Sequence, residues 1–394
     1  MSRNATSAKF LAVPEVKVSL ISLAHGVNDM YAGFLPVFIP HIKEVLGLNY
    51  TLAGALSVIV GICHIVFQPM IGYMCDRIRR PYLMMVGPIL CGLGAVMVPN
   101  SGTYGLALFF AGLWGLGSAL FHPQGTGGVG YVARQEKLPQ ALTLFNIAGT
   151  LGTLLSPVIA VSVTKLWGYK GLFLTLFPPL ILAPLLFFSM PLLRQELPED
   201  LGQKDGFFKT LLAVFGVLYP VWGVALVRDI VFQGVRFFLP LKISADGGSL
   251  DAIGAVLFCC TLGGTLSMIP VERLSRRVGV KRTLWHSMFL GGVILFLAAK
   301  TVGMVSIALY VLGISCIYSS MSLTVFIAQM LMPHKRSIAS SLVMGLAWGV
   351  ANISLLPIGS VADILGIQAT LVSLALLPFL GLLFFACPIF KKVS

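Results

Sequence analysis

The chain consists mainly of long apolar stretches separated by short polar turns. The stretches run to roughly 20 residues or more, enough for a helix to cross the ~30 Å hydrocarbon core of a bilayer. Runs such as 371–385 are apolar on every face, so the alternation expected of membrane β-strands is missing. Because a spanning segment must satisfy its own backbone hydrogen bonds, the pattern predicts an all-α integral membrane protein.

The apolar stretches predict twelve transmembrane helices, six in each half of the chain. The first six predicted spans are 17–42, 50–74, 82–99, 103–131, 140–165 and 170–192. The last six are 208–241, 250–274, 281–299, 302–331, 337–361 and 367–390. The polar segment 1–16 lacks the layout of a cleavable signal peptide, so we expect the first helix to remain in the mature protein.

Similar motifs in the two halves predict a repeated six-helix unit. The sequence FLP occurs at 34–36 in the first span and at 238–240 in the seventh. The basic turn 76–80 after the second span corresponds to 272–277 after the eighth. Parallel repeats with a substrate site between them are the design of one class of transporters. We therefore expect an N-terminal bundle at 1–193, a cytoplasmic linker at 194–208 and a C-terminal bundle at 209–394.

Composition supports a membrane protein and argues against a cofactor-binding one. Of the 394 residues 57% are apolar and 10% are charged, and the mean hydropathy is +0.94. The seven Cys show no paired spacing and are interpreted as small apolar fillers. Segment 125–130 matches G-x-G-x-x-G, but no strand-helix-strand pattern surrounds it, so we expect no cofactor and no resident metal. We interpret these glycines as sites of close helix approach.

The net charge of +13 is explained by the distribution of Lys and Arg rather than by nucleic-acid binding. Twenty of the 27 basic residues fall in one alternating set of loops and termini, and five fall in the other set. The positive-inside rule then predicts cytoplasmic termini and an even number of spans in a bacterial inner membrane. The remaining two, Arg228 and Arg236, lie inside a predicted span.

Segment 72–80, which reads GYMCDRIRR, resembles the loop 2–3 signature of the major facilitator superfamily. The resemblance implies that family's fold and transport by alternating access. A carboxylate flanked by guanidinium groups at a helix end can latch two halves in one state, whereas the simpler interpretation is positive-inside charge alone. The residues assigned to the latch are Gly72, Asp76, Arg77, Arg80, Glu272 and Arg273.

Within the superfamily the chain looks most like the fosmidomycin-resistance type of efflux protein. The resemblance lies in 25–31 (HGVNDMY) with Leu35-Pro36 and in 121–125 (FHPQG), and it covers both halves. It implies efflux of a small drug-like solute. Ala111 stands where many proton-linked drug antiporters carry Arg, so the direction of transport stays open.

Ionisable side chains inside a span are costly in lipid and therefore mark candidate sites. His25 and Asp29 are four residues apart and share one helix face, with Asn28 beside them. We assign proton coupling to Asp29 and His25. A structural hydrogen bond to a neighbouring helix is the alternative.

The seventh span contains a second cluster of polar residues. Asp229, Gln233 and Arg236 share a face, and Arg228 lies about 100° away around the helix. Two arginines against one acid leave a positive charge that suits a phosphonate, phosphate or carboxylate. Pairing of one arginine with Asp29 as a gate is the alternative.

In the fourth span Pro123 removes a backbone donor and can bend the helix, so His122 is expected to line a cavity. His64 is interpreted as a packing residue. The substrate-binding residues predicted are Asn28, Tyr31, His122, Gln124, Arg228, Asp229, Gln233 and Arg236.

These features predict a secondary active transporter, not an enzyme, that performs proton-coupled efflux of a small drug-like or anionic solute. The expected partners are that solute, protons and the lipid bilayer, and we expect a monomer that binds no nucleic acid. Uptake or exchange of an organic anion is the nearest alternative. Transport of a transition metal or metal chelate, with His25, Asp29 and His122 as ligands, is a further one. Motifs of intramembrane hydrolases are missing from the sequence.

Overall fold

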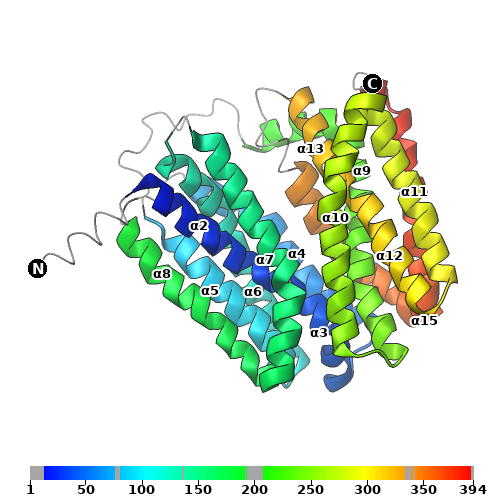
Figure 1. Ribbon diagram of the computed structural model, residues 1–394, viewed down its shortest axis with the longest axis horizontal. Helices are drawn as coiled ribbons and strands as arrows, with labels where there is room; N and C mark the ends of the chain where they lie inside the picture. The colour runs from blue at the N-terminus through cyan, green and yellow to red at the C-terminus, as the bar shows by residue number, and fades with distance from the viewer. Residues whose placement is uncertain are drawn as a thin grey trace, which may run out of the picture. The chain divides into compact units, whose positions relative to one another are not determined.

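The computed structural model describes residues 13–75, 80–134, 137–190, 192, 207–332, 339 and 342–391. Every regular element in these ranges is a helix (Figure 1). Ten of the described helical segments are long and apolar enough to cross a membrane. The predicted all-α membrane architecture is thus confirmed for the described part of the chain.

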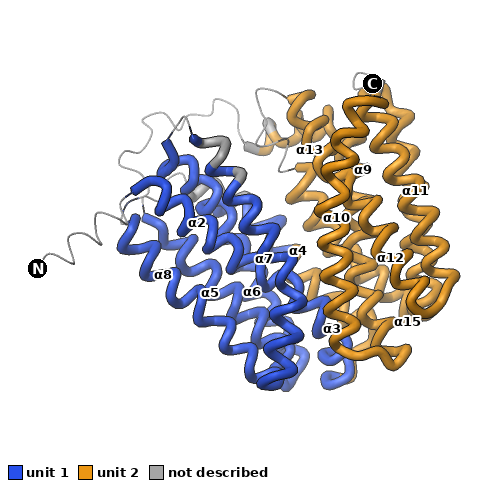
Figure 2. The backbone as a smooth tube through the Cα atoms, in the orientation of Figure 1, with its two compact units in different colours: residues 1–46, 62–200 blue, residues 47–61, 201–394 orange. Residues whose placement is uncertain are grey.

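The chain forms two compact units (Figure 2). Unit 1 comprises residues 1–46 and 62–200, and unit 2 comprises 47–61 and 201–394. Helix α4 (Tyr50–Cys75) therefore belongs to unit 2 in its first part and to unit 1 in the rest. The predicted linker, 194–208, lies outside the described residues except for its last two, which begin α9. The predicted bundle boundaries stay predictions.

In unit 1, α2, α5, α6, α7 and α8 run alongside one another (Figure 1). The elements of unit 1 besides α4 are α2 (Pro14–Asp29), η1 (Met30–Gly33), α3 (Phe34–Val45), α5 (Tyr82–Met97), η2 (Val98–Asn100), α6 (Tyr104–Val132), α7 (Leu138–Trp167), η4 (Tyr169–Leu176) and α8 (Phe177–Ser189).

The first predicted span, 17–42, is interrupted by a 3-10 turn, η1, between α2 and α3. Pro36 has no N–H to bond to the carbonyl of Ala32, so the regular i to i−4 pattern cannot continue there. The Gly33 N–H instead donates to Ser156 Oγ on α7 at 2.8 Å. The chain thus changes from α2 to α3 just after the polar residues of the first span.

Glycines on α7 allow it to lie directly against α2. A Cβ on Gly152 would lie 2.0 Å from the Gly26 carbonyl oxygen, and one on Gly149 would lie 2.4 Å from Cε1 of His25. Only hydrogen side chains permit this approach. The space left by Gly149 is therefore occupied by the imidazole ring of His25.

In unit 2, α15 packs along α9. The elements of unit 2 besides the start of α4 are α9 (Phe207–Ala245), α10 (Leu250–Val278), α11 (Val280–Lys300), α12 (Gly303–Tyr318), α13 (Ser320–Leu331), the π-helical turn η5 (Leu342–Leu346), α15 (Ala347–Gly381), η6 (Leu382–Ala386) and η7 (Pro388–Lys391).

Local sequence signals set several ends of these helices. Ser249 caps α10 by accepting a hydrogen bond from the Ala252 N–H at 3.2 Å, and Gly279, with φ of 91°, follows its last residue. Gly366, with φ of 81°, divides α15 where the predicted spans 337–361 and 367–390 meet. The apolar segment Leu342–Ala386 therefore contains parts of two predicted spans. The count of twelve is compatible with the described helices and stays a prediction.

Candidate functional site

Three ionisable side chains converge in unit 1. Asp29, at the end of α2, lies between His25, one turn earlier, and His122 of α6. His25 Nε2 is 3.2 Å from Asp29 Oδ2, and His122 Nε2 is 3.5 Å from Asp29 Oδ1. The side chains of His25, Asp29 and His122 are 10%, 20% and 26% exposed, so each retains limited access to solvent. We call these three residues the His-Asp-His cluster.

The orientation of His25 is set by its neighbours. Its Nδ1 lies 2.8 Å from the carbonyl oxygen of Phe145 on α7, and its ring stacks on Phe145 with centroids 3.9 Å apart. A carbonyl oxygen can only accept a hydrogen bond, so Nδ1 carries a hydrogen and donates it. Nε2 therefore faces Asp29 and is the nitrogen whose proton can come and go.

That geometry requires a proton between His25 and Asp29. Without one, the bare Nε2 and the carboxylate oxygen are both acceptors, and two acceptors 3.2 Å apart cannot bond to each other. Either the imidazole is doubly protonated or the carboxyl group is protonated. In both states the pair holds one proton that solvent can reach.

Two further polar groups border the cluster. Asn28 Nδ2 donates to Asp29 Oδ1 at 3.1 Å, whereas the buried Asn28 Oδ1 has no hydrogen-bond partner among the described residues. His64 of α4 interacts electrostatically with His122 and Asp29, and its buried Nε2 likewise lacks a partner in the described part of the chain. The apolar run around His64 predicted packing, and no sequence spacing linked it to the cluster.

The same three residues have the geometry of a metal-ligand set. Their candidate ligand atoms lie within 4.8 Å of one another. Two imidazole nitrogens and one carboxylate oxygen suit a first-row transition metal. The cluster can therefore hold either a proton or a small cation.

Gln124 and Tyr31 form hydrogen bonds to the backbone. Gln124 Nε2 donates to the Arg80 carbonyl oxygen at 2.9 Å, and its Oε1 accepts from the Met84 N–H at 2.8 Å. The Tyr31 hydroxyl donates to the Thr175 carbonyl oxygen at 2.6 Å. These bonds fasten the start of α5 and the turn η4 within unit 1. The substrate contacts predicted for Gln124 and Tyr31 stay predictions.

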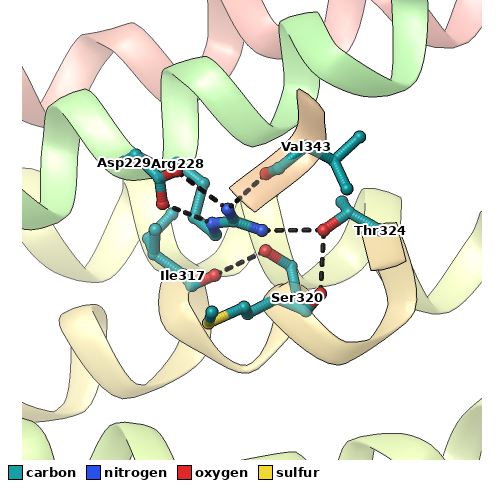
Figure 3. A network of polar contacts seen from close by, with 7 residues as sticks. Arg228, Asp229, Ile317, Ser320, Thr324 and Val343 are labelled. Atoms are coloured by element: carbon teal, nitrogen blue, oxygen red, sulfur yellow. Dashed lines mark hydrogen bonds and ion pairs between the residues drawn. The ribbon is translucent and has the colours of Figure 1, made fainter. Parts of the chain in front are cut away.

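In unit 2, Arg228 and Asp229 of α9 form a bidentate ion pair (Figure 3). Arg228 Nε and Nη2 lie 2.7 and 2.9 Å from the two carboxylate oxygens of Asp229. Arg228 Nη1 also donates to Thr324 Oγ1 at 2.7 Å. Both side chains are almost completely buried. The acid of α9 is thus neutralised by its immediate neighbour.

Arg236 has a different environment. It is 4% exposed, and it forms no ion pair with any acid that the structure describes. Its Nε lacks a hydrogen-bond partner within the described ranges, and its guanidinium carbon lies 5.2 Å from the ring centroid of Phe232. Phe232 in turn stacks on Tyr318 of α12 with centroids 4.2 Å apart. Arg236 is therefore a buried cation beside the aromatic ring of Phe232.

Gln233, on the same face of α9, bonds to a residue that sequence reasoning did not select. Its Nε2 donates to Asn352 Oδ1 on α15 at 2.8 Å. Asn352 Nδ2 donates to the Trp348 carbonyl oxygen at 3.1 Å, which fixes the orientation of the amide. Only packing of α15 along α9 brings the two amides together.

The predicted latch residues are described in part. Asp76 and Arg77 lie outside the described residues. Arg80 Nη1 donates to the Tyr82 hydroxyl at 3.0 Å, and Glu272 pairs with Arg276 one turn later on α10. The latch role of Gly72, Arg273 and the others stays a prediction.

The family model of the Major Facilitator Superfamily matches residues 21–241, more than half of the chain. The chain belongs to the Major Facilitator Superfamily. It is accordingly a multi-pass membrane transporter and not an enzyme, and the predicted family and fold class are confirmed.

Relatives and solved structures agree with this assignment over most of the chain. The chain is 26% identical over 397 residues to the "Uncharacterized MFS-type transporter YfnC" of Bacillus subtilis (strain 168), covering 95% of this chain and 93% of that one. It is 24% identical over 373 residues to the "Fosmidomycin resistance protein" of Escherichia coli (strain K12), covering 92% and 90%.

Solved transporter structures share the fold at low sequence identity. A bacterial homologue of the human lysosomal transporter Spinster matches with a TM-score of 0.78 and 13% identity, covering 97% of this chain and 98% of that one. The nucleoside transporter NupG matches with a TM-score of 0.75 and 14% identity, covering 95% and 99%. These structures bear on the fold alone.

Proposed function

We propose that this transporter couples proton movement to efflux of a small anionic or drug-like solute by alternating access. The His-Asp-His cluster binds the proton, and Arg236 binds the negative charge of the solute. The protein works as a monomer in a bacterial inner membrane, with both termini in the cytoplasm. Similarity to a protein named for fosmidomycin resistance supports the efflux direction and a drug-like solute.

The observation that carries the proposal is the contact between His25 Nε2 and Asp29 Oδ2. The Phe145 carbonyl requires the hydrogen of His25 on Nδ1, so the 3.2 Å contact with Asp29 depends on one additional proton. Loss of that proton removes the bond and leaves two acceptors facing each other. Because the carbonyl that orients His25 belongs to α7, protonation of the pair is linked to the contact between α2 and α7, and a proton site at a contact between helices is what coupling requires.

Charge balance in unit 2 supports an anionic solute. Asp229 neutralises Arg228, and the described residues supply no acid for Arg236. A buried cation is costly in a membrane protein unless a partner compensates its charge. An anion that bears a planar or apolar group can pair with the guanidinium and contact the rings of Phe232 and Tyr318.

The experiment measures proton flux and exchange in proteoliposomes. Fosmidomycin and a set of small phosphonates and carboxylates are added to vesicles that carry a pH-sensitive dye. Asp29→Asn is expected to abolish solute-driven proton flux while leaving solute exchange at least partly intact, because the amide keeps the shape but cannot titrate. Asp246→Asn, which alters an exposed acid paired with Lys242, is the matched control and retains wild-type flux.

Unchanged proton flux in Asp29→Asn would contradict the coupling role of the cluster. Efflux predicts proton flux when solute is added on the cytoplasmic side of the protein. Proton flux only when solute is added on the extracytoplasmic side would favour uptake or exchange of an organic anion.

The geometry of the cluster also favours a second candidate function, transport of a transition metal as cargo. Two imidazoles and a carboxylate within 4.8 Å of one another suit such an ion. Uptake of Zn²⁺ or Mn²⁺ into proteoliposomes without any pH gradient, lost in His122→Ala, would support it. Solute-driven proton flux without metal uptake would exclude it.

A further inference from the structure

The first turn of α4 is capped by a carboxylate from the other end of the sequence. Asp363 of α15 accepts hydrogen bonds from the Tyr50 N–H at 2.7 Å and the Thr51 N–H at 2.9 Å. It also accepts one from the Thr51 hydroxyl at 2.5 Å. Asn49 caps the next amide locally, because its Oδ1 accepts from the Leu52 N–H at 2.8 Å. Two of the first three amides of α4 are thus bonded by a residue 312 or more positions away.

This arrangement is stronger than an ordinary surface contact. Amides in the first turn of a helix have no partner within the helix, and the helix dipole places partial positive charge there. A carboxylate that accepts two such N–H bonds combines both effects in charge-assisted hydrogen bonds. Asp363 remains exposed, so water can replace these bonds when the helices part.

Close backbone packing continues the contact along α4. A Cβ on Gly54 would lie 2.6 Å from the Leu355 carbonyl oxygen, and one on Gly359 would lie 2.6 Å from the Tyr50 carbonyl oxygen. A Cβ on Gly61 would lie 2.8 Å from Cβ of Asn352. The first half of α4 therefore lies directly on the backbone of α15, which is why residues 47–61 group with unit 2.

We propose that Asp363 is a latch that holds the start of α4 on α15 in one access state and releases it in the other. In sequence α4 belongs to the first six-helix repeat and α15 to the second, and repeats move against each other during alternating access. A cap that α15 supplies to α4 is formed only while the two helices are in contact. The proposal rests on alternating access alone and does not depend on proton coupling or on the identity of the solute.

The first test uses hydrogen exchange resolved to single amides in the purified full-length protein. Asp363→Asn keeps a capping side chain but loses the charge, and we expect the Tyr50 and Thr51 amides to exchange at least tenfold faster. Asn49→Ala is the matched control, because it removes a cap from the same helix turn without touching α15. In Asn49→Ala the Leu52 amide should exchange faster, and the exchange rates of the Tyr50 and Thr51 amides should stay at their wild-type values. Equal exchange of Tyr50 and Thr51 in Asp363→Asn and the wild type would overturn the proposal.

The second test asks whether the contact must open. Thr51 Oγ1 and Ser360 Oγ are 3.1 Å apart, so Thr51→Cys with Ser360→Cys places two thiols within reach of a disulfide. Oxidation should slow exchange in segments outside α4, α9 and α15, including 120–131 of α6, and reduction should restore it, because the locked protein no longer moves between access states. Each single variant serves as control.

If cross-linking alters exchange only near residues 51 and 360, the contact is a static packing feature and the latch is refuted. Because neither test requires a solute or a pH gradient, loss of proton coupling in Asp29→Asn vesicles would leave the latch standing. Conversely, a refuted latch would leave the coupling proposal intact.

Discussion

Arg228 and Arg236 lie on the same helix, yet among the described residues only the charge of Arg228 is compensated by an ion pair. Arg228 bends back to its neighbour Asp229 and also donates to Thr324 Oγ1 and the Val343 carbonyl oxygen. Arg236 instead lies over the ring of Phe232, and its Nε lacks a partner among the described residues. At the scale of single residues, the function of each side chain therefore follows from its partners rather than from its type.

Arg236→Gln is expected to weaken transport of an anionic solute at least tenfold more than transport of a neutral one. Gln keeps a hydrogen-bonding side chain but removes the charge that pairs with the anion. Competition by phosphonates and by their neutral esters in the proteoliposome assay measures the difference. Arg228→Gln is the control, and it should instead reduce folding, since breaking a buried ion pair costs about 3–5 kcal/mol. Equal loss for both solutes in well-expressed Arg236→Gln would point to gating or folding.

Gly149→Ala is expected to reduce proton coupling without removing any ionisable group. The added Cβ would lie 2.4 Å from Cε1 of His25, so the ring must leave its position between Phe145 and Asp29. Overpacking typically costs about 1–3 kcal/mol, which disfavours the ring position that contacts Asp29 by about tenfold. Solute-driven proton flux should fall by a similar factor. Gly130→Ala on α6 is the control, because a Cβ there meets open space. Normal flux in Gly149→Ala would show that the position of the His25 ring does not matter.

At the scale of elements, the break between α2 and α3 places the polar residues of the first span. The regular α-helical hydrogen bonding ends at Asp29, where the short turn η1 begins, and Pro36 in the first turn of α3 lacks the N–H that would continue it. The Gly33 N–H that this break releases finds Ser156 on α7. The break is therefore stabilised by the same helix that holds His25.

Ser156→Ala is expected to lower the free energy of unfolding by about 1–3 kcal/mol, because it leaves a buried N–H without a partner. Thermal unfolding of the detergent-purified protein measures the change. Ser162→Ala, on the exposed face of the same helix, should leave the midpoint unchanged. A wild-type unfolding midpoint in Ser156→Ala would contradict the prediction and would indicate that water replaces the hydroxyl as the partner of the Gly33 N–H.

At the scale of the whole molecule, α4 is bonded at its start to one acid, Asp363, and is followed in the sequence by a second acid, Asp76 of the predicted latch. Asp363 caps the first turn, and Asp76 follows the last residue of the helix in the sequence. Contacts at opposite ends of one membrane-spanning helix should stabilise opposite access states. The two acids are therefore expected to act against each other.

Asp76→Asn and Asp363→Asn are expected to shift the conformational equilibrium in opposite directions. Asp363→Asn should speed exchange of the Tyr50 and Thr51 amides, whereas Asp76→Asn should slow it by favouring the state in which Asp363 is bound. Asp76→Asn should also slow turnover more than it weakens solute binding. A shift of the same sign in both variants, or a loss of affinity at unchanged turnover, would disprove the opposition.

The helical spans and the family could be predicted from the sequence because lipid imposes a strict length and polarity on every spanning segment. Spacing of four residues likewise put His25 and Asp29 on one face, as observed. The start of α6 at Tyr104 and the division at Gly366 lie within a few residues of the predicted limits, since local caps and glycines set them. Sequence periodicity and local signals thus predicted those features that depend only on neighbouring residues of the chain.

Tertiary structure alone decided which polar groups meet across helices. Helical periodicity indicates a face, but not the neighbour opposite it or the reach of a long side chain. Arg228 thus reached an acid that the helical wheel placed 100° away. His64 came into electrostatic range of Asp29 and His122. Asp363 met Tyr50 across more than 300 residues, because these contacts depend on how the helices pack and not on any spacing in the chain.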